Sequence, residues 1–202
     1  MGPFGDQYQE RNQIIIEEIE NRMGFWELVF KSLYVNTGRE IKSILEIGAG
    51  KGPNIIAIEK VSTKYELPMQ LFATEINAKA RIALQENCKT LTILDDIPDQ
   101  PIADLVFTYG VMIHTHPAHI KQLQTRMYNA SNRFLMCVEY FAPTTEMIPY
   151  RGETDALWRD DYGSHFLRNC SLRVIRYGFA WKRMSGLDNL TYFLFEKTKK
   201  MQ

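Results

Sequence analysis

Apolar residues near the N-terminus recur at spacings of three and four, which is the period of an amphipathic helix. Between residues 8 and 35 they are Ile15, Ile19, Met23, Trp26 and Phe30. The pattern predicts helix over most of this stretch. Gly24 lies inside it and is the point at which the stretch could divide into two helices.

Beyond residue 40, short apolar runs alternate with longer amphipathic segments. The runs predict five strands, at KSILEIG, MQLFATEI, KTLTILDD, ADLVFTYG and NRFLMCVEYF. The segments between them predict helices, at PNIIAIEKVSTKY, NAKARIALQEN and PAHIKQLQTRMYNA. Elements that alternate in this way form an α/β fold, a doubly wound and mostly parallel sheet with helices on both faces.

The C-terminal part of the chain has a different pattern. A polar loop, APTTEMIPYRGETD, follows Phe141, and a short helix is predicted near 155–168. SLRVIRYGFAWKR and LDNLTYFLFEKTK then predict an antiparallel hairpin at one edge of a seven-stranded sheet. We expect the core of this hairpin to contain its aromatic residues, Phe179, Trp181, Tyr192, Phe193 and Phe195.

Composition narrows the choice of partner and compartment. The 202 residues include 24 Lys and Arg against 24 Asp and Glu, which argues against a general nucleic-acid binder. The three cysteines are far apart and form no CxxC pair, as is typical of reduced thiols in a cytoplasmic protein. No signal-peptide pattern and no apolar run of about 18 residues is present. We therefore expect a cytoplasmic monomer or homodimer with no membrane or nucleic-acid partner.

A glycine-rich turn follows the first predicted strand. A phosphate-binding P-loop would need GxxxxGK followed by Ser or Thr, which is absent. A dinucleotide-binding GxGxxG turn would place its third glycine on Pro53, which also disfavours an NAD-linked oxidoreductase. The spacing Glu46-x-Gly48-x-Gly50-x-Gly52 instead resembles the first motif of class I S-adenosylmethionine-dependent methyltransferases, E/DxGxGxG. The resemblance implies that the turn passes under the methionine and ribose parts of the cofactor, and that Glu46 orders the turn or meets the cofactor's ammonium group.

Polar residues follow the next three strands, where ligands bind in open α/β sheets. Glu75 ends the second strand and suits the two ribose hydroxyls, and Asp95 and Asp96 follow the third, near the expected adenine. A helix cap for Glu75, and a turn for the two aspartates, are the alternatives. The resemblance implies binding of S-adenosyl-L-methionine, with S-adenosyl-L-homocysteine as product, by Glu46, Gly48, Ala49, Gly50, Asn54, Glu75, Ile76, Asp95, Asp96, Ile97, Tyr109 and Arg11.

A narrower resemblance covers about Tyr8 to Lys197. YQERNQ, LVFTYGVMIHTHP, the EYFxPxxxxxPYRG segment and DNLTYFLFEK resemble the methylases associated with pseudaminic acid biosynthesis. This implies one domain, with an N-terminal helical lid at 1–36, a cofactor-binding core at 41–140, and a substrate loop and terminal strands at 141–202. It also implies O-methylation of a small polar, anionic or sugar-like acceptor, bound by Tyr8, His114, Tyr140, Tyr150, Arg151 and Lys182.

The expected catalytic residues are His114, Glu139 and Tyr8. His114 follows the fourth strand and is a candidate base if the acceptor is a hydroxyl, whereas an anionic oxygen needs none. It could instead only position the substrate. Glu139 ends the fifth strand, and we expect it to orient Arg151 or Tyr8.

Arg151 is the predicted anion clamp, because a guanidinium fork matches a carboxylate or phosphonate. An ordinary surface loop is the alternative. His116 and His119 lie near His114, but a metal needs three convergent ligands and no carboxylate or cysteine is close, so no metal is expected. Methylation of a protein or RNA, and a non-catalytic cofactor-binding subunit, are the alternative functions. TYGV stands where nucleic-acid amino methylases carry [DN]PP[YF], which disfavours a nucleic-acid substrate.

Overall fold

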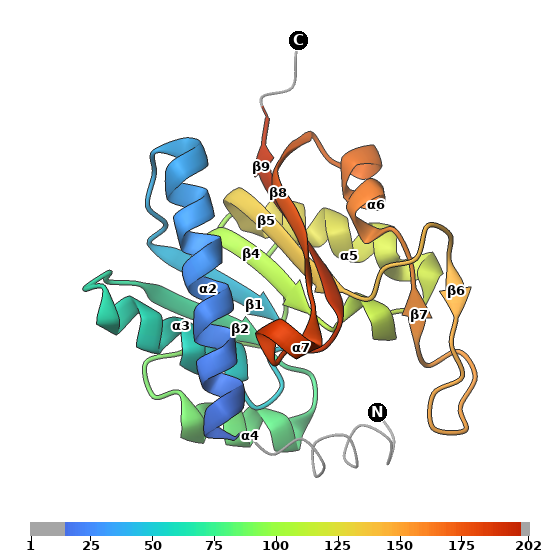
Figure 1. The fold of residues 1–202 in the computed structure, drawn as a ribbon, viewed down its shortest axis with the longest axis horizontal. Helices are drawn as coiled ribbons and strands as arrows, with labels where there is room; N and C mark the ends of the chain where they lie inside the picture. The colour runs from blue at the N-terminus through green and yellow to red at the C-terminus, as the bar shows by residue number, and fades with distance from the viewer. Residues whose placement is uncertain (1–14, 199–202) are drawn as a thin grey trace.

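The computed structural model describes residues 15–198 and places seven strands in one sheet (Figure 1). In spatial order they are β3 (Thr92–Leu94), β2 (Gln70–Thr74), β1 (Ser43–Ile47), β4 (Ala103–Tyr109), β5 (Ser131–Glu139), β9 (Leu190–Lys197) and β8 (Leu172–Ala180). The first five are parallel, and β9 is antiparallel to both β5 and β8. The predicted mostly parallel sheet with an antiparallel C-terminal hairpin is confirmed.

Helices cover both faces of the sheet. One face carries α2 (Ile16–Thr37), α3 (Pro53–Lys64) and α4 (Ala78–Asn87), and the other carries α5 (Pro117–Ala130) and α6 (Tyr162–Asn169). Successive side chains of a strand point to opposite faces, so Ile44 joins the core under α2 and α3 while Leu45 joins the core under α5. Because β1, β4 and β5 are adjacent and parallel, their C-terminal ends lie side by side at the same end of the strands.

The N-terminal stretch is one continuous helix through Gly24, so a division at this glycine is not observed. Trp26 explains why the helix persists. It is fully buried, and its ring lies edge-on to Phe107 of β4 with a centroid distance of 4.7 Å. Burying a tryptophan stabilises by more than the roughly 1 kcal/mol that a helical glycine costs. The described part of this segment therefore packs against the sheet, and its role as a lid stays a prediction.

The C-terminal hairpin differs in part from expectation. Tyr192 and Phe195 are buried, but Phe179 and Trp181 are 59% and 50% exposed, so the prediction of a core position for these two is wrong. They belong to the edge strand β8 and the residue after it, where a neighbouring strand lies on one side only. A short helix, α7 (Lys182–Ser185), forms part of the turn between β8 and β9.

The segment between β5 and α6 forms a small arm beside the sheet (Figure 1). It contains two short antiparallel strands, β6 (Glu146–Met147) and β7 (Trp158–Arg159). The helix after it begins at Tyr162, later than predicted, because the Asp161 side chain caps it by accepting from the Ser164 amide at 2.9 Å. Within residues 15–198 no helix is both long and apolar enough to cross a bilayer.

Candidate functional site

The glycine turn lies between β1 and α3 and is anchored to the end of β2. The Gly48 and Ala49 amides donate to the Thr74 carbonyl at 2.9 and 3.1 Å, and the Gly50 amide donates to Glu75 Oε2 at 2.7 Å. The other oxygen of Glu75 accepts from the Asn77 amide at 2.7 Å. Glu75 therefore fixes the turn and keeps further acceptor capacity on each oxygen.

All three glycines have positive φ, and at two of them neighbouring side chains also leave no room for a Cβ. Gly48 has φ +71°, and a Cβ there would lie 2.7 Å from Val111 Cγ2. Gly52 has φ +90°, and its Cβ would lie 2.5 Å from Leu84 Cδ1. Side chains are excluded at both positions by backbone conformation and by neighbouring packing, which is a reason for glycine beyond the approach of a ligand.

Glu46 is the buried carboxyl at the end of β1. Its Oε1 accepts from Asn54 Nδ2 at 2.6 Å, and its Oε2 is buried without a hydrogen-bond partner among residues 15–198. Burial raises the pKa of Glu46 to about 8, against the opposing influence of Asn54 and Arg22. A buried acceptor without a donor is unfavourable by itself, and a ligand with an N–H group would satisfy it.

Arg22 is a functional candidate that sequence reasoning missed. Its Nη1 donates to Asn54 Oδ1 at 2.7 Å, and its Nη2 forms an ion pair with Glu18 at 2.7 Å. Its guanidinium carbon lies 4.4 Å from the centroid of the Tyr109 ring at the end of β4. The signal was present in the sequence, because residue 22 falls on the same helical stripe as Ile19 and Trp26, where an arginine is unexpected.

The predicted adenine-side residues lie at the same edge of the sheet. The Asp95 carboxylate is exposed and forms an ion pair with Arg81 at 2.7 Å, and Asp96 pairs with Arg126 at 2.8 Å. Ile97 is buried, whereas Ile76, directly after Glu75, is 79% exposed. Ile76 can therefore pack against a flat aromatic ring of a ligand, while the neighbouring Glu75 carboxylate binds a polar group of the same ligand.

Glu139 holds the backbone after β4. Its two oxygens accept from the amides of Val111 and Ile113 at 3.2 and 3.3 Å. Burial raises the pKa of Glu139 to about 7, although the Thr108 hydroxyl and the backbone amides act to lower it. The Thr108 hydroxyl lies near this carboxyl but forms no hydrogen bond of normal geometry among the described residues. In the described part of the chain Glu139 contacts these amides rather than Arg151.

His114 lies just after β4, and its side chain contacts the backbone of the arm. It closes a single 3-10 turn, η1 (Met112–His114), and its Nδ1 lies 2.7 Å from the Ala156 carbonyl oxygen. A carbonyl only accepts, so Nδ1 carries the hydrogen and Nε2 is the nitrogen that can take up a proton. The Tyr150 ring lies 5.6 Å from the His114 ring.

The two predicted cationic residues are in different settings. Arg151 is exposed at the tip of the arm with φ +55°, and its guanidinium lies 5.2 Å from the Tyr150 ring centroid. Lys182, at the start of α7, is also exposed and pairs with Asp188 at 3.1 Å. Arg151 thus lies beside the residue that contacts His114, whereas the ammonium of Lys182 already contacts a carboxylate.

His116 and His119 contribute differently from His114. His116 caps α5, since its Nδ1 accepts from the Ala118 amide at 3.2 Å, and His119 is exposed. Among residues 15–198 no three His, Cys, Asp or Glu side chains are placed to hold a metal ion. Tyr8 and Arg11 lie outside the described residues.

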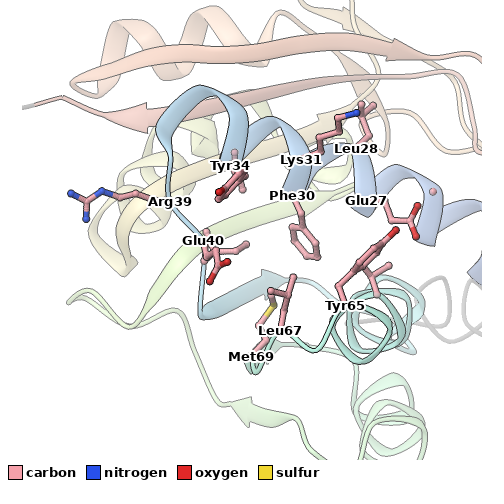
Figure 2. Close-up of a pocket in the computed structure, with 14 residues that line it drawn as sticks. Glu27, Leu28, Phe30, Lys31, Tyr34, Arg39, Glu40, Tyr65, Leu67 and Met69 are labelled. Carbon is pink, nitrogen blue, oxygen red and sulfur yellow. The ribbon is translucent and has the colours of Figure 1, made fainter.

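A large cavity lies elsewhere, at the opposite edge of the sheet (Figure 2). Its volume is about 730 Å³, and it lies between the C-terminal half of α2, the end of α3 and the residues before β1 and β2. Phe30, Tyr65 and Met69 line it, with Arg39 and Glu40 at one side. Ligands of open α/β sheets bind at the carboxyl ends of the strands, so we assign the candidate site to the glycine turn and not to this cavity.

Known structures resemble the whole chain. No known family model and no curated protein sequence matches it significantly. The magnesium protoporphyrin IX methyltransferase of Synechocystis PCC 6803, solved with bound SAM, is 13% identical with a TM-score of 0.65, over 98% of this chain and 92% of that one. A Burkholderia thailandensis 1,6-didemethyltoxoflavin-N1-methyltransferase is 12% identical with a TM-score of 0.64, over 90% and 79%. A plantazolicin methyltransferase in complex with SAH is 14% identical with a TM-score of 0.59, over 96% and 88%. The chain therefore has the Rossmann-like fold of S-adenosylmethionine-dependent methyltransferases.

Proposed function

We propose that this protein is an S-adenosylmethionine-dependent methyltransferase that methylates an oxygen of a small polar acceptor, anionic or sugar-like. The observation that carries the proposal is the buried Glu46 carboxyl, whose Oε2 has no partner in the described part of the chain, beside a glycine turn anchored by Glu75. The cofactors bound in structures of the same fold are consistent with this assignment.

The residues present fit this cofactor. Glu46 Oε2 would accept from its ammonium group, and the remaining acceptor capacity of Glu75 would take its ribose hydroxyls. The exposed Ile76 side chain would cover its adenine. When bound, the cofactor supplies a methyl group attached to a good leaving group, so the protein mainly provides alignment.

The acceptor would lie at the ends of β4 and β5, under the arm. There His114 presents Nε2 as a base for a hydroxyl acceptor, because Nδ1 is held by the Ala156 carbonyl. Arg151 would bind an anionic group of the acceptor from the tip of the arm. Glu139 positions the loop that carries His114 by accepting from two of its amides.

Calorimetry followed by a transfer assay tests the proposal. Wild-type protein is titrated with S-adenosylhomocysteine and compared with Gly50→Val, in which a branched side chain would stand at a residue with φ +57°. We expect clear binding to the wild type and none to the variant. Labelled cofactor is then supplied with acidic sugars and phosphonates, and in parallel with protein and RNA. Absence of binding, or methylation of the macromolecules alone, would contradict the proposal.

A further inference from the structure

The arm carries a second cation at its base. In β7 the side chains of Trp158 and Arg159 point to opposite sides, as in any strand. Trp158 is buried, with its ring 5.5 Å from that of His116. The exposed Arg159 turns the other way, and its guanidinium lies 6.0 Å from the centroid of the Tyr140 ring.

Tyr140 places this guanidinium at the candidate site. It follows β5 directly, and β5 pairs with β4, the strand that ends at Tyr109. Tyr140 and Tyr109 are both partly buried against the same hydrophobic core. Arg159 therefore lies near the C-terminal end of β5, and β7 also contacts η1, the turn that carries His114.

No carboxylate of residues 15–198 forms an ion pair with Arg159. Glu146 is its cross-strand partner in the arm, yet the two form no ion pair. A guanidinium presents its N–H donors in a fixed planar fork that matches an oxyanion. The arm itself is fixed in place, since His114 binds the Ala156 carbonyl three residues before Arg159.

We propose that Arg159 binds an oxyanion of the methyl acceptor, a carboxylate or a phosphonate-type group, at the base of the arm. That the ligand is the methyl acceptor rests on the proposed function. The anion site itself follows from the geometry of the arm. Arg159 is then an acceptor-binding residue closer to the strand ends than Arg151, and both cations contact one elongated or doubly anionic ligand.

Titration with malonate and with inorganic phosphate tests this site, with each probe added to the protein alone and to protein saturated with S-adenosylhomocysteine. Arg159→Gln is expected to weaken binding of the probes about tenfold, and Arg159→Lys less, because a two-point charged contact is lost. Arg39→Gln, the same charge change at an exposed residue of the opposite edge, should bind as wild type does. Thermal unfolding of Arg159→Gln should be unchanged, since the side chain is exposed.

The outcomes separate the two proposals. Binding of only one probe supports the site and identifies the class of oxyanion. The protein could bind the anions through Arg159 and yet fail to bind S-adenosylhomocysteine. That result would support the anion site and contradict the proposed function. Equal binding by wild type and Arg159→Gln, or no binding of either probe to the wild type, overturns the inference.

Discussion

The Glu75 carboxylate accepts a hydrogen bond of 2.7 Å from the Gly50 amide and so joins the end of β2 to the glycine turn after β1. One side chain thereby shapes the turn and presents acceptors at the candidate cofactor site. Replacing Glu75 by Ala should weaken binding of S-adenosylhomocysteine by about 1–3 kcal/mol, because buried donors lose a charged partner.

Calorimetry measures this loss. Glu86→Ala, the same charge change at an exposed position of α4, is the matched control and should bind normally. If Glu75→Ala bound S-adenosylhomocysteine with unchanged affinity, Glu75 would play no part in cofactor binding.

Gly52→Ala should destabilise the fold by about 1–3 kcal/mol, through its positive φ and the clash with Leu84. Gly24→Ala has open space around its Cβ inside a helix and should stabilise by about 0.5–1 kcal/mol. Urea unfolding of both variants measures the difference. A stable Gly52→Ala protein would show that the turn does not require glycine there.

Cofactor binding should release a proton from Glu46. With a pKa of about 8, roughly nine-tenths of the Glu46 carboxyls are protonated at pH 7. An ammonium at Oε2 would favour the ionised form and lower this pKa, so binding at pH 7 should release close to one proton and strengthen as pH rises toward 8. Calorimetry of S-adenosylhomocysteine binding in buffers of different ionisation enthalpy counts the protons.

Glu46→Gln is the control for this release, because it keeps an acceptor for Asn54 but cannot ionise. Its binding should be weaker and should release no proton from this site. In the unliganded protein the raised pKa has the opposite consequence for folding. The unfolded state loses the Glu46 proton at lower pH, so the wild type becomes less stable from about pH 4.5 to 8, and Glu46→Gln should lack that part of the decline.

Arg22→Met should weaken S-adenosylhomocysteine binding about tenfold, since Asn54 and the Tyr109 ring both lose their cationic neighbour. Methionine keeps the apolar stem and the helix propensity of α2. Arg39→Met, at an exposed position, should bind as wild type does. Wild-type affinity in Arg22→Met would show that the Arg22–Asn54 contact plays no part in the site.

His114→Ala should distinguish the acceptor classes. With a hydroxyl acceptor, loss of a general base lowers turnover by about 10²–10⁴, whereas an anionic oxygen needs no base and should lose much less. His119→Ala, an exposed histidine of α5, controls for histidine removal and should keep full turnover. An equally large loss with both kinds of acceptor would assign His114 to positioning rather than proton transfer.

The sequence by itself determined the order of the seven strands of the sheet and of its main helices, but not β6, β7 or α7, because periodicity and glycine punctuation are local properties of the chain. It also located Glu46 and Glu75, since carboxylates at strand ends are visible without coordinates. Only the tertiary structure showed that the Glu75 carboxylate accepts from the Gly50 amide. It also showed that Arg22 of the N-terminal helix α2 contacts Asn54, and that Arg159 lies over the Tyr140 ring. These contacts join residues distant in sequence, and no local pattern encodes them. The glycines at 48 and 52 show the same division, because spacing indicated a special turn, while the neighbours that exclude a side chain were set by packing.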